Sequence, residues 1–122
     1  MLKKVLLAEQ DEDDRKLFAD LLKDIGCDTI QIKDFQDVVE LALTNSPDLI
    51  ILSENEQEES LSKTVKTLKD NEDTRLIPIL AALNNAQEKQ KEALAKVGVD
   101  DFIYRPFSVV AFLNKIKEML AE

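Results

Sequence analysis

Two runs of acidic and amide side chains, at residues 9–14 and 53–59, are the positions in this sequence best suited to chemistry. Each run follows a short apolar segment, and carboxylate and amide oxygens are the ligands that divalent cations such as magnesium prefer. One interpretation is therefore a divalent-metal site. The other is a pair of solvated loops whose charges favour the N-termini of the helices that follow. We adopt the second, because the carboxylates have no fixed ligand spacing, and we predict neither a bound metal nor a cofactor.

The composition excludes several classes of function. The chain has no histidine, so it lacks the commonest general base and metal ligand, and it cannot act as a phosphohistidine donor. Its 16 basic and 25 acidic residues give a net charge of −9, and the lysines form no basic block. Nucleic acid is disfavoured as a partner, because neutralising its phosphates requires clusters of Lys and Arg.

Cysteine usage and the N-terminal segment bear on where the protein resides. Cys27 is the only cysteine, so no internal disulfide can form, and one free thiol suits a reducing cytoplasm. The apolar run at residues 5–8 is too short for a signal peptide or a membrane span. We therefore expect a cytoplasmic protein that does not associate with the membrane.

Short apolar segments alternate with helical patterns along the whole chain, and these elements must position the acidic runs. The expected strands are 4–8, 29–32, 49–53, 77–83 and 101–104, and the expected helices are 13–25, 35–45, 61–70, 86–97 and 108–120. Continuous apolar strands indicate a parallel sheet covered on both faces. We predict one α/β domain over residues 1–122, a flavodoxin-like doubly wound (βα)5 sandwich with strand order 2-1-3-4-5. The first and fifth helices are expected on one face, and the other three on the opposite face.

Ligands of such open sheets bind beyond the carboxyl ends of the strands, where the strand order reverses. In this sequence that point lies at the ends of the first and third strands, so both acidic runs are expected at the same edge of the sheet.

The sequence resembles a response-regulator receiver domain of the CheY-like family along nearly its full length. The segments that carry the resemblance are 4–11 with Arg15, Gly26, 46–53, 77–81 and 98–107, and each falls at the expected point of the alternation. Residues 16–21 and 107–113 further resemble the DivK-type polar-differentiation receivers. The resemblance implies a cis peptide bond between Arg105 and Pro106.

The family's working residues are replaced at each matching position. The family ends its first strand with two adjacent acids that bind magnesium, and this chain has Glu9 and Gln10. The phosphoacceptor aspartate that ends the third strand is Ser53. The Ser or Thr that ends the fourth strand and contacts the phosphoryl group is Leu83. The lysine that precedes the Pro-Phe pair is Arg105.

The loop after the phosphoacceptor position departs as well, with Glu56-Gln57 for Met-Pro and Ser60-Leu61 for Asp-Gly. Phosphoryl transfer depends on positioning and on electrostatic stabilisation by metal and cations, and a serine hydroxyl needs an adjacent base to attack. Too few oxygen ligands remain for magnesium to bind more tightly than about millimolar. We therefore predict a degenerate pseudo-receiver that is not an enzyme, has no catalytic residues and accepts no phosphate.

A chain of this kind is expected to act as a phosphorylation-independent protein–protein interaction module in bacterial two-component-type signalling. A histidine kinase or another signalling protein is the expected partner, and the chain itself is expected to be a monomer or a weak dimer. Receivers commonly present the face formed by the fourth helix, fifth strand and fifth helix, so the candidate partner-binding residues are Phe102, Tyr104 and Phe107. Phe102 occupies the family's aromatic switch position, although a simply packed aromatic would also explain it.

Alternative interpretations remain open from the sequence. The chain could be a conventional phosphoacceptor response regulator or the receiver portion of a larger multidomain regulator. Some receivers offer the first helix to a kinase dimer, and Leu17, Phe18 and Leu21 suit that role as well as they suit the core.

Glu9 and Arg105 stand at positions that converge on one pocket in the family. Each has a longer side chain than the residue it replaces, so we predict that the two form a direct ion pair, with Leu83 closing off one side. The alternative is that both side chains point into solvent.

Overall fold

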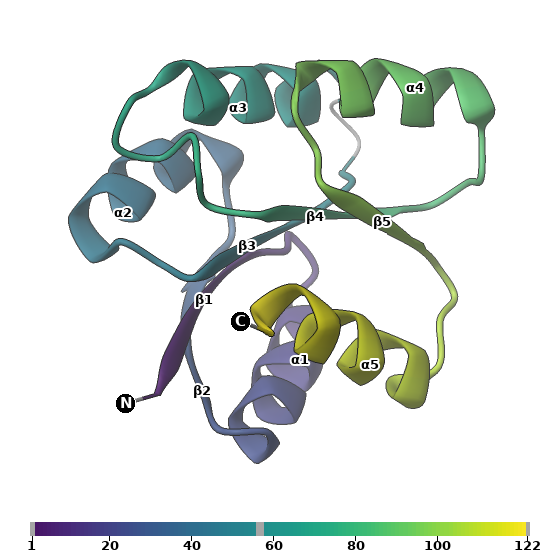
Figure 1. Cartoon of the computed structure of the whole chain (residues 1–122). Coiled ribbons are helices and arrows are strands. Elements are labelled where there is room, and N and C mark those ends of the chain that lie inside the picture. The colour runs from purple at the N-terminus through teal and green to yellow at the C-terminus, as the bar shows by residue number, and fades with distance from the viewer. Residues whose placement is uncertain (1, 56–57, 122) are drawn as a thin grey trace.

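The computed structural model describes residues 2–55 and 58–121 (Figure 1). Two residues of the loop discussed above, Glu56 and Gln57, lie outside the described residues, as does the side chain of Ser60.

The strands within the described residues form one five-stranded parallel sheet with the order β2-β1-β3-β4-β5. The strands are β1 (Lys3–Ala8), β2 (Cys27–Ile32), β3 (Leu49–Ser53), β4 (Ile79–Leu83) and β5 (Asp101–Tyr104). The predicted fold class and strand order are confirmed.

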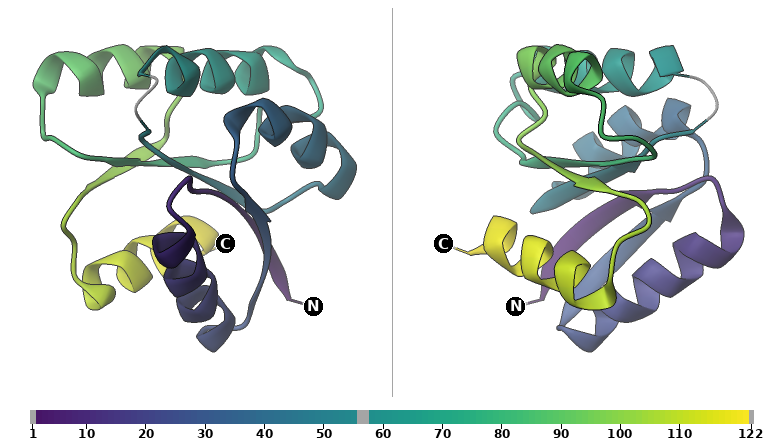
Figure 2. Two further views of the ribbon diagram at one scale, coloured as in Figure 1. Left: turned by 180° about the vertical axis from the view of Figure 1, so that it is seen from behind. Right: turned by 90° about the vertical axis from the view of Figure 1, so that its right-hand side faces the viewer.

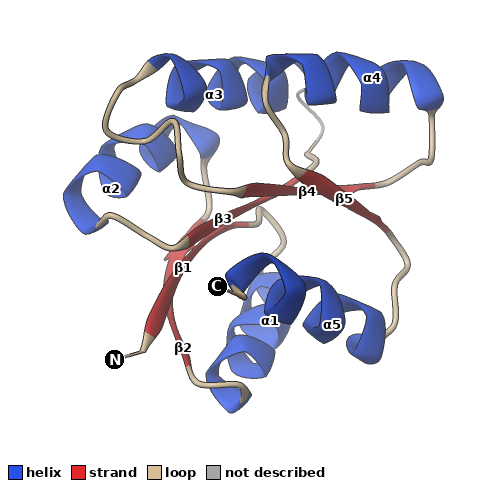
Figure 3. Ribbon diagram, in the orientation of Figure 1, coloured by secondary structure: helices blue, strands red, loops and turns tan. Residues whose placement is uncertain are grey.

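Helices cover both faces of this sheet, which makes a three-layer molecule (Figure 2). The helices are α1 (Glu12–Asp24), the 3₁₀ turn η1 (Phe35–Asp37), α2 (Val38–Asn45), α3 (Glu58–Asp70), α4 (Glu88–Val97) and α5 (Val109–Leu120). α1 and α5 lie on one face, and α2, α3 and α4 lie on the other, as predicted (Figure 3). Among the described helices, none combines the length and apolar character needed to cross a lipid bilayer.

Some predicted boundaries were wrong. The fourth strand was expected to begin at residue 77, but β4 begins at Ile79. Pro78 has no N–H to donate to a neighbouring strand, so it cannot take a full place in a central ladder; its carbonyl still accepts from Ile50 N at 3.0 Å. The second helical segment begins with a 3₁₀ turn, α3 begins three residues earlier than expected, and α4 begins at Glu88 rather than at residue 86.

The strands bury alternate residues on opposite faces, which gives two separate cores. In β1, Leu6 and Ala8 belong to the core under α2, α3 and α4, whereas Val5 and Leu7 belong to the core under α1 and α5. Cys27 is buried in the second core, and burial together with the nearby Asp48 carboxylate raises the pKa of its thiol. The thiol is therefore held in its unreactive, protonated form.

The connection from β5 to α5 is shaped by a cis peptide bond between Arg105 and Pro106, as the resemblance implied. Ser108 then caps α5, since its hydroxyl accepts from Ala111 N at 3.0 Å. Phe107 packs against two rings of the second core, with centroid separations of 5.5 Å to Phe18 and 5.5 Å to Phe112. These contacts hold the segment after Arg105 against α1 and α5.

Ser46 ends α2 in the left-handed region, with φ 48° and ψ 60°. This conformation is costly for a residue with a Cβ atom and nearly free for glycine. Ser46→Gly is expected to raise the free energy of unfolding by roughly 0.5–1 kcal/mol, measured by chemical denaturation. The matched control Ser46→Ala keeps the Cβ atom and should give no gain. Equal stability of the glycine variant and the wild type would argue against strain at this position.

Candidate functional site

The candidate site lies at the carboxyl ends of the strands. Glu9 directly follows β1, Ser53 ends β3 and Arg105 directly follows β5. Glu9 and Ser53 are both buried, with 3% and 1% of their surface exposed. A charged residue with so little exposure needs a partner of opposite charge.

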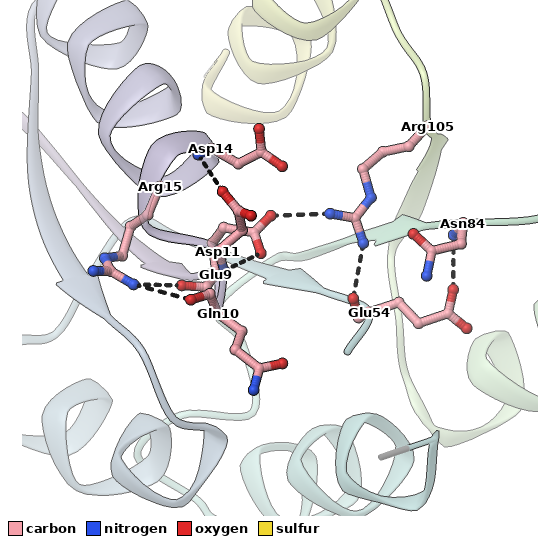
Figure 4. A network of polar contacts seen from close by, with 8 residues as sticks. All are labelled: Glu9, Gln10, Asp11, Asp14, Arg15, Glu54, Asn84 and Arg105. Carbon is pink, nitrogen blue, oxygen red and sulfur yellow. Dashed lines mark hydrogen bonds and ion pairs between the residues drawn. The ribbon is translucent and has the colours of Figure 1, made fainter. Parts of the chain in front are cut away.

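That partner is Arg105, whose Nη1 donates to Glu9 Oε1 at 3.0 Å (Figure 4). The second carboxylate oxygen of Glu9, Oε2, accepts from Asp11 N at 3.2 Å. The Glu9 backbone is held as well, because its N donates to Ile32 O at 3.0 Å. The ion pair expected from the longer side chains is therefore present, and neither side chain simply points into solvent.

Arg105 also reaches a second strand end, since its Nη2 donates to Glu54 O at 2.8 Å. Its backbone N donates to Leu83 O at 2.8 Å. On the far side of Glu9, Arg15 of α1 donates from Nη1 to Glu9 O at 2.9 Å. Through its contacts with Glu9, Glu54 and Leu83, Arg105 links the end of its own strand, β5, to the ends of β1, β3 and β4.

The Glu54 side chain extends the network to α4. Its Oε2 accepts from Asn84 N at 2.7 Å, and its Oε1 accepts from Gln90 Nε2 at 2.6 Å. Its backbone N donates to Ala82 O at 2.8 Å. The sequence placed Glu54 in an acidic run but could not distinguish it from its acidic neighbours. No pattern in the sequence indicated that Gln90 belongs to the site.

A shallow pocket of about 260 Å³ opens beside this network. It is lined by Glu9, Gln10, Asp11, Asp14, Glu54, Asn55, Asn84 and Arg105. Four of these residues are carboxylates and one is a guanidinium that is already paired. Within residues 2–55 and 58–121, no cluster of three or more acidic, Cys or His side chains has the arrangement needed to hold a metal ion.

Ser53 and Leu83 lie outside the lining of this pocket. Ser53 pairs with Ala82 in the sheet and faces the α1–α5 core, and its Oγ has no hydrogen-bond partner among the described residues. Leu83 is fully buried in the opposite core, beneath α3 and α4. The prediction that Leu83 closes off one side of the ion pair was wrong. Adjacent residues of a strand face opposite sides of the sheet. Ala82 belongs to the core under α1 and α5, so its neighbour Leu83 faces α3 and α4 instead.

The candidate partner-binding residues do not form a single cluster. Phe102 and Tyr104 are half-buried and pack against the core under α4, where Lys91 Nζ lies 5.9 Å from the centre of the Phe102 ring. Phe107 lies on the other side of the sheet with the aromatic cluster of α1 and α5. On α1, Leu17 is 49% exposed, whereas Phe18 is buried in the core.

Comparisons with known proteins point to one family. The polar-differentiation response regulator DivK of Brucella ovis is 34% identical over 122 residues, which is 100% of this chain and 99% of the relative. Chemotaxis response regulator CheY4 of Vibrio cholerae has the same fold, with a TM-score of 0.91 at 21% identity, over 98% of this chain and 100% of that one. A scan against protein-family models finds no match.

A further solved structure of the same fold contains a bound metal ion. The receiver domain of sensor histidine kinase PA1611 from Pseudomonas aeruginosa PAO1 has a TM-score of 0.88 at 18% identity, and the two chains cover each other completely, at 100% each. That structure has a magnesium ion coordinated in its active-site cleft.

Arg105→Ala should destabilise the domain, because it leaves the buried Glu9 carboxylate without its cation. Breaking a buried ion pair from one side costs about 3 kcal/mol or more, and this loss should appear in chemical denaturation. The control is the double variant Glu9→Gln with Arg105→Ala, which leaves no uncompensated charge and should be less destabilised than the sum of the single variants. An Arg105→Ala variant as stable as the wild type would show that the pair has no structural role.

Proposed function

Because the chain belongs to the response-regulator family of receiver domains, we propose that it acts in two-component signalling as a pseudo-receiver, which binds a protein partner without being phosphorylated. The observation that supports this most strongly is the hydrogen-bonded network of Glu9, Arg105 and Glu54. It pairs Glu9 and Arg105, whose positions in the family meet magnesium and a phosphoryl group, directly with each other.

The chemistry at Ser53 supports the same conclusion. A serine hydroxyl attacks phosphorus only when a neighbouring base removes its proton. The chain has no histidine, and among the described residues nothing accepts a hydrogen bond from Ser53 Oγ. The hydroxyl is also buried, so a kinase would have little access to it.

The charge of the pocket is unfavourable for a phosphodonor. Four carboxylates and one guanidinium line it, and the guanidinium donates to Glu9 and to the Glu54 carbonyl. An approaching phosphate anion would meet a net negative surface, and the described residues that line the pocket include no second cation to compensate. Gln10, which replaces a family acid, supplies an amide where magnesium would prefer a charged oxygen.

The surface most suited to a partner is formed by α4 and β5, where Phe102 and Tyr104 are partly exposed. Aromatic side chains are frequent anchors of protein interfaces, because they bury a large area and lose little conformational entropy. A histidine kinase or another signalling protein is the partner we propose for this surface.

Phosphate uptake tests the proposal directly. The protein is incubated with acetyl phosphate and magnesium and its intact mass is measured, with a conventional receiver treated in parallel as the positive control. We expect no added phosphate, because the nucleophile has no base and the pocket repels anions. A stoichiometric, base-labile adduct on the wild type would overturn the proposal, and its absence from Ser53→Ala would place it on that residue.

Partner binding tests the proposed surface. Proteins cross-linked to the wild type are identified, and the affinity of the purified partner is then measured for Phe102→Ala and for a control, Leu43→Ala. Leu43 is 41% exposed on α2, away from the proposed surface. Loss of an aromatic anchor should weaken binding by about tenfold or more, and the control should bind normally. Equal affinity of Phe102→Ala and the wild type would exclude Phe102 from the interface.

A further inference from the structure

We infer that the Glu54 carboxylate is a built-in anionic clamp that positions the first turns of α4, and through them the surface around Phe102. The clamp consists of Glu54, Asn84 and Gln90. This inference rests on the proposed function, in which no phosphoryl group controls the connection between β4 and α4. It assigns to Glu54 a role that its place in an acidic run does not reveal.

Both hydrogen bonds of the clamp are short. Glu54 Oε2 accepts from the backbone N of Asn84 at 2.7 Å, and Oε1 accepts from the side chain of Gln90 at 2.6 Å. Hydrogen bonds to an ionised acceptor are roughly twice as strong as those between neutral groups. Asn84 directly follows Leu83, the position whose side chain contacts the phosphoryl group in the family. A permanent carboxylate therefore binds the backbone next to the place where a transient anion would act.

Apolar packing and side-chain capping contribute little to holding the start of α4. Every side chain from residue 84 to residue 89 is exposed, so no apolar burial anchors this segment. The N-cap residue Gln87 makes no side-chain capping bond. The first buried side chain of α4 is Leu94, in the second half of the helix. Segments with few buried contacts open at low free-energy cost unless specific hydrogen bonds restrain them, so the Glu54 contacts are expected to restrain this end.

The clamp reaches the proposed binding surface within one turn of helix. Gln90 donates to the Glu54 carboxylate, and the adjacent Lys91 lies over the ring of Phe102, with Nζ 5.9 Å from its centre. A shift of this turn would move Lys91 relative to Phe102. The other end of Glu54, its carbonyl, is held by Arg105. Glu54 is thus a positioning residue between the ion pair and the α4–β5 surface.

Amide hydrogen exchange tests the clamp. Glu54→Ala should increase exchange of the Asn84 amide and of the Lys91 amide, which donates to Gln87 O, by about tenfold or more, which corresponds to the loss of one charge-assisted hydrogen bond. The Asn84 amide is a direct reporter, because it donates to Glu54. Exchange in β1 and β3 should not change. The control Glu92→Ala removes the same charge from an exposed position on α4 and should leave residues 84–91 as in the wild type.

A second measurement shows whether Glu54 affects the surface around Phe102 or only the start of α4. 4-Fluorophenylalanine is placed at position 102, and its fluorine resonance is expected to shift or broaden in Glu54→Ala and to stay unchanged in Glu92→Ala. Glu54→Gln keeps an oxygen that can accept from Asn84 N and should restore the resonance in part. Faster exchange at 84–91 with an unchanged resonance would overturn the positioning role.

Two safeguards keep the test decisive. If Glu54→Ala unfolds, Gln90→Ala removes one of the same contacts from the surface of α4 and should still accelerate exchange at residues 84–91. Unchanged exchange in these variants would reject the clamp and leave the phosphate result untouched. Phosphate uptake by the wild type, by contrast, would refute the proposed function whatever the exchange rates are.

Discussion

The guanidinium of Arg105 lies where the carboxyl ends of the strands converge, and it donates to the Glu9 carboxylate and to the Glu54 carbonyl. Glu9 is almost completely buried, so its charge would be costly without this cation. The net contribution of such a pair to stability can be small, because both charges lose water. Its consequence for structure is larger, since it fixes the positions of loops that follow three different strands.

This interaction also changes what the site can do. In a pocket built for phosphoryl transfer, cations must be free to meet the incoming charge. Here the cation is paired within the chain, and carboxylates dominate the remaining lining. The same side chains that stabilise the strand ends therefore support our proposal that the pocket does not accept phosphate.

The helices on the two faces of the sheet are held in different ways. On one face, Phe18, Phe107 and Phe112 stack together and hold α1, α5 and the segment after Arg105 as one unit. On the other face, α4 is anchored by Leu94 in its second half and by polar contacts at its start. A surface held by a few polar contacts is easier to reposition than a packed core, and this supports our proposal that the partner binds on the α4–β5 side.

The sequence by itself determined the sheet, its strand order and the face on which each helix lies, because apolar periodicity and right-handed crossovers leave few alternatives. It also predicted the Glu9–Arg105 pair, since both positions converge in the family and both side chains are long. Only the tertiary structure decided that Glu54 reaches α4, because a run of acidic residues in a sequence does not specify the path of its loop. It also decided that Leu83 faces the core under α3 and α4 rather than the pocket. The alternation of side chains along a strand shows that neighbouring residues lie on opposite faces of the sheet. It does not show which of the two faces the pocket opens on, because that depends on where the loops beyond the strand ends lie in space.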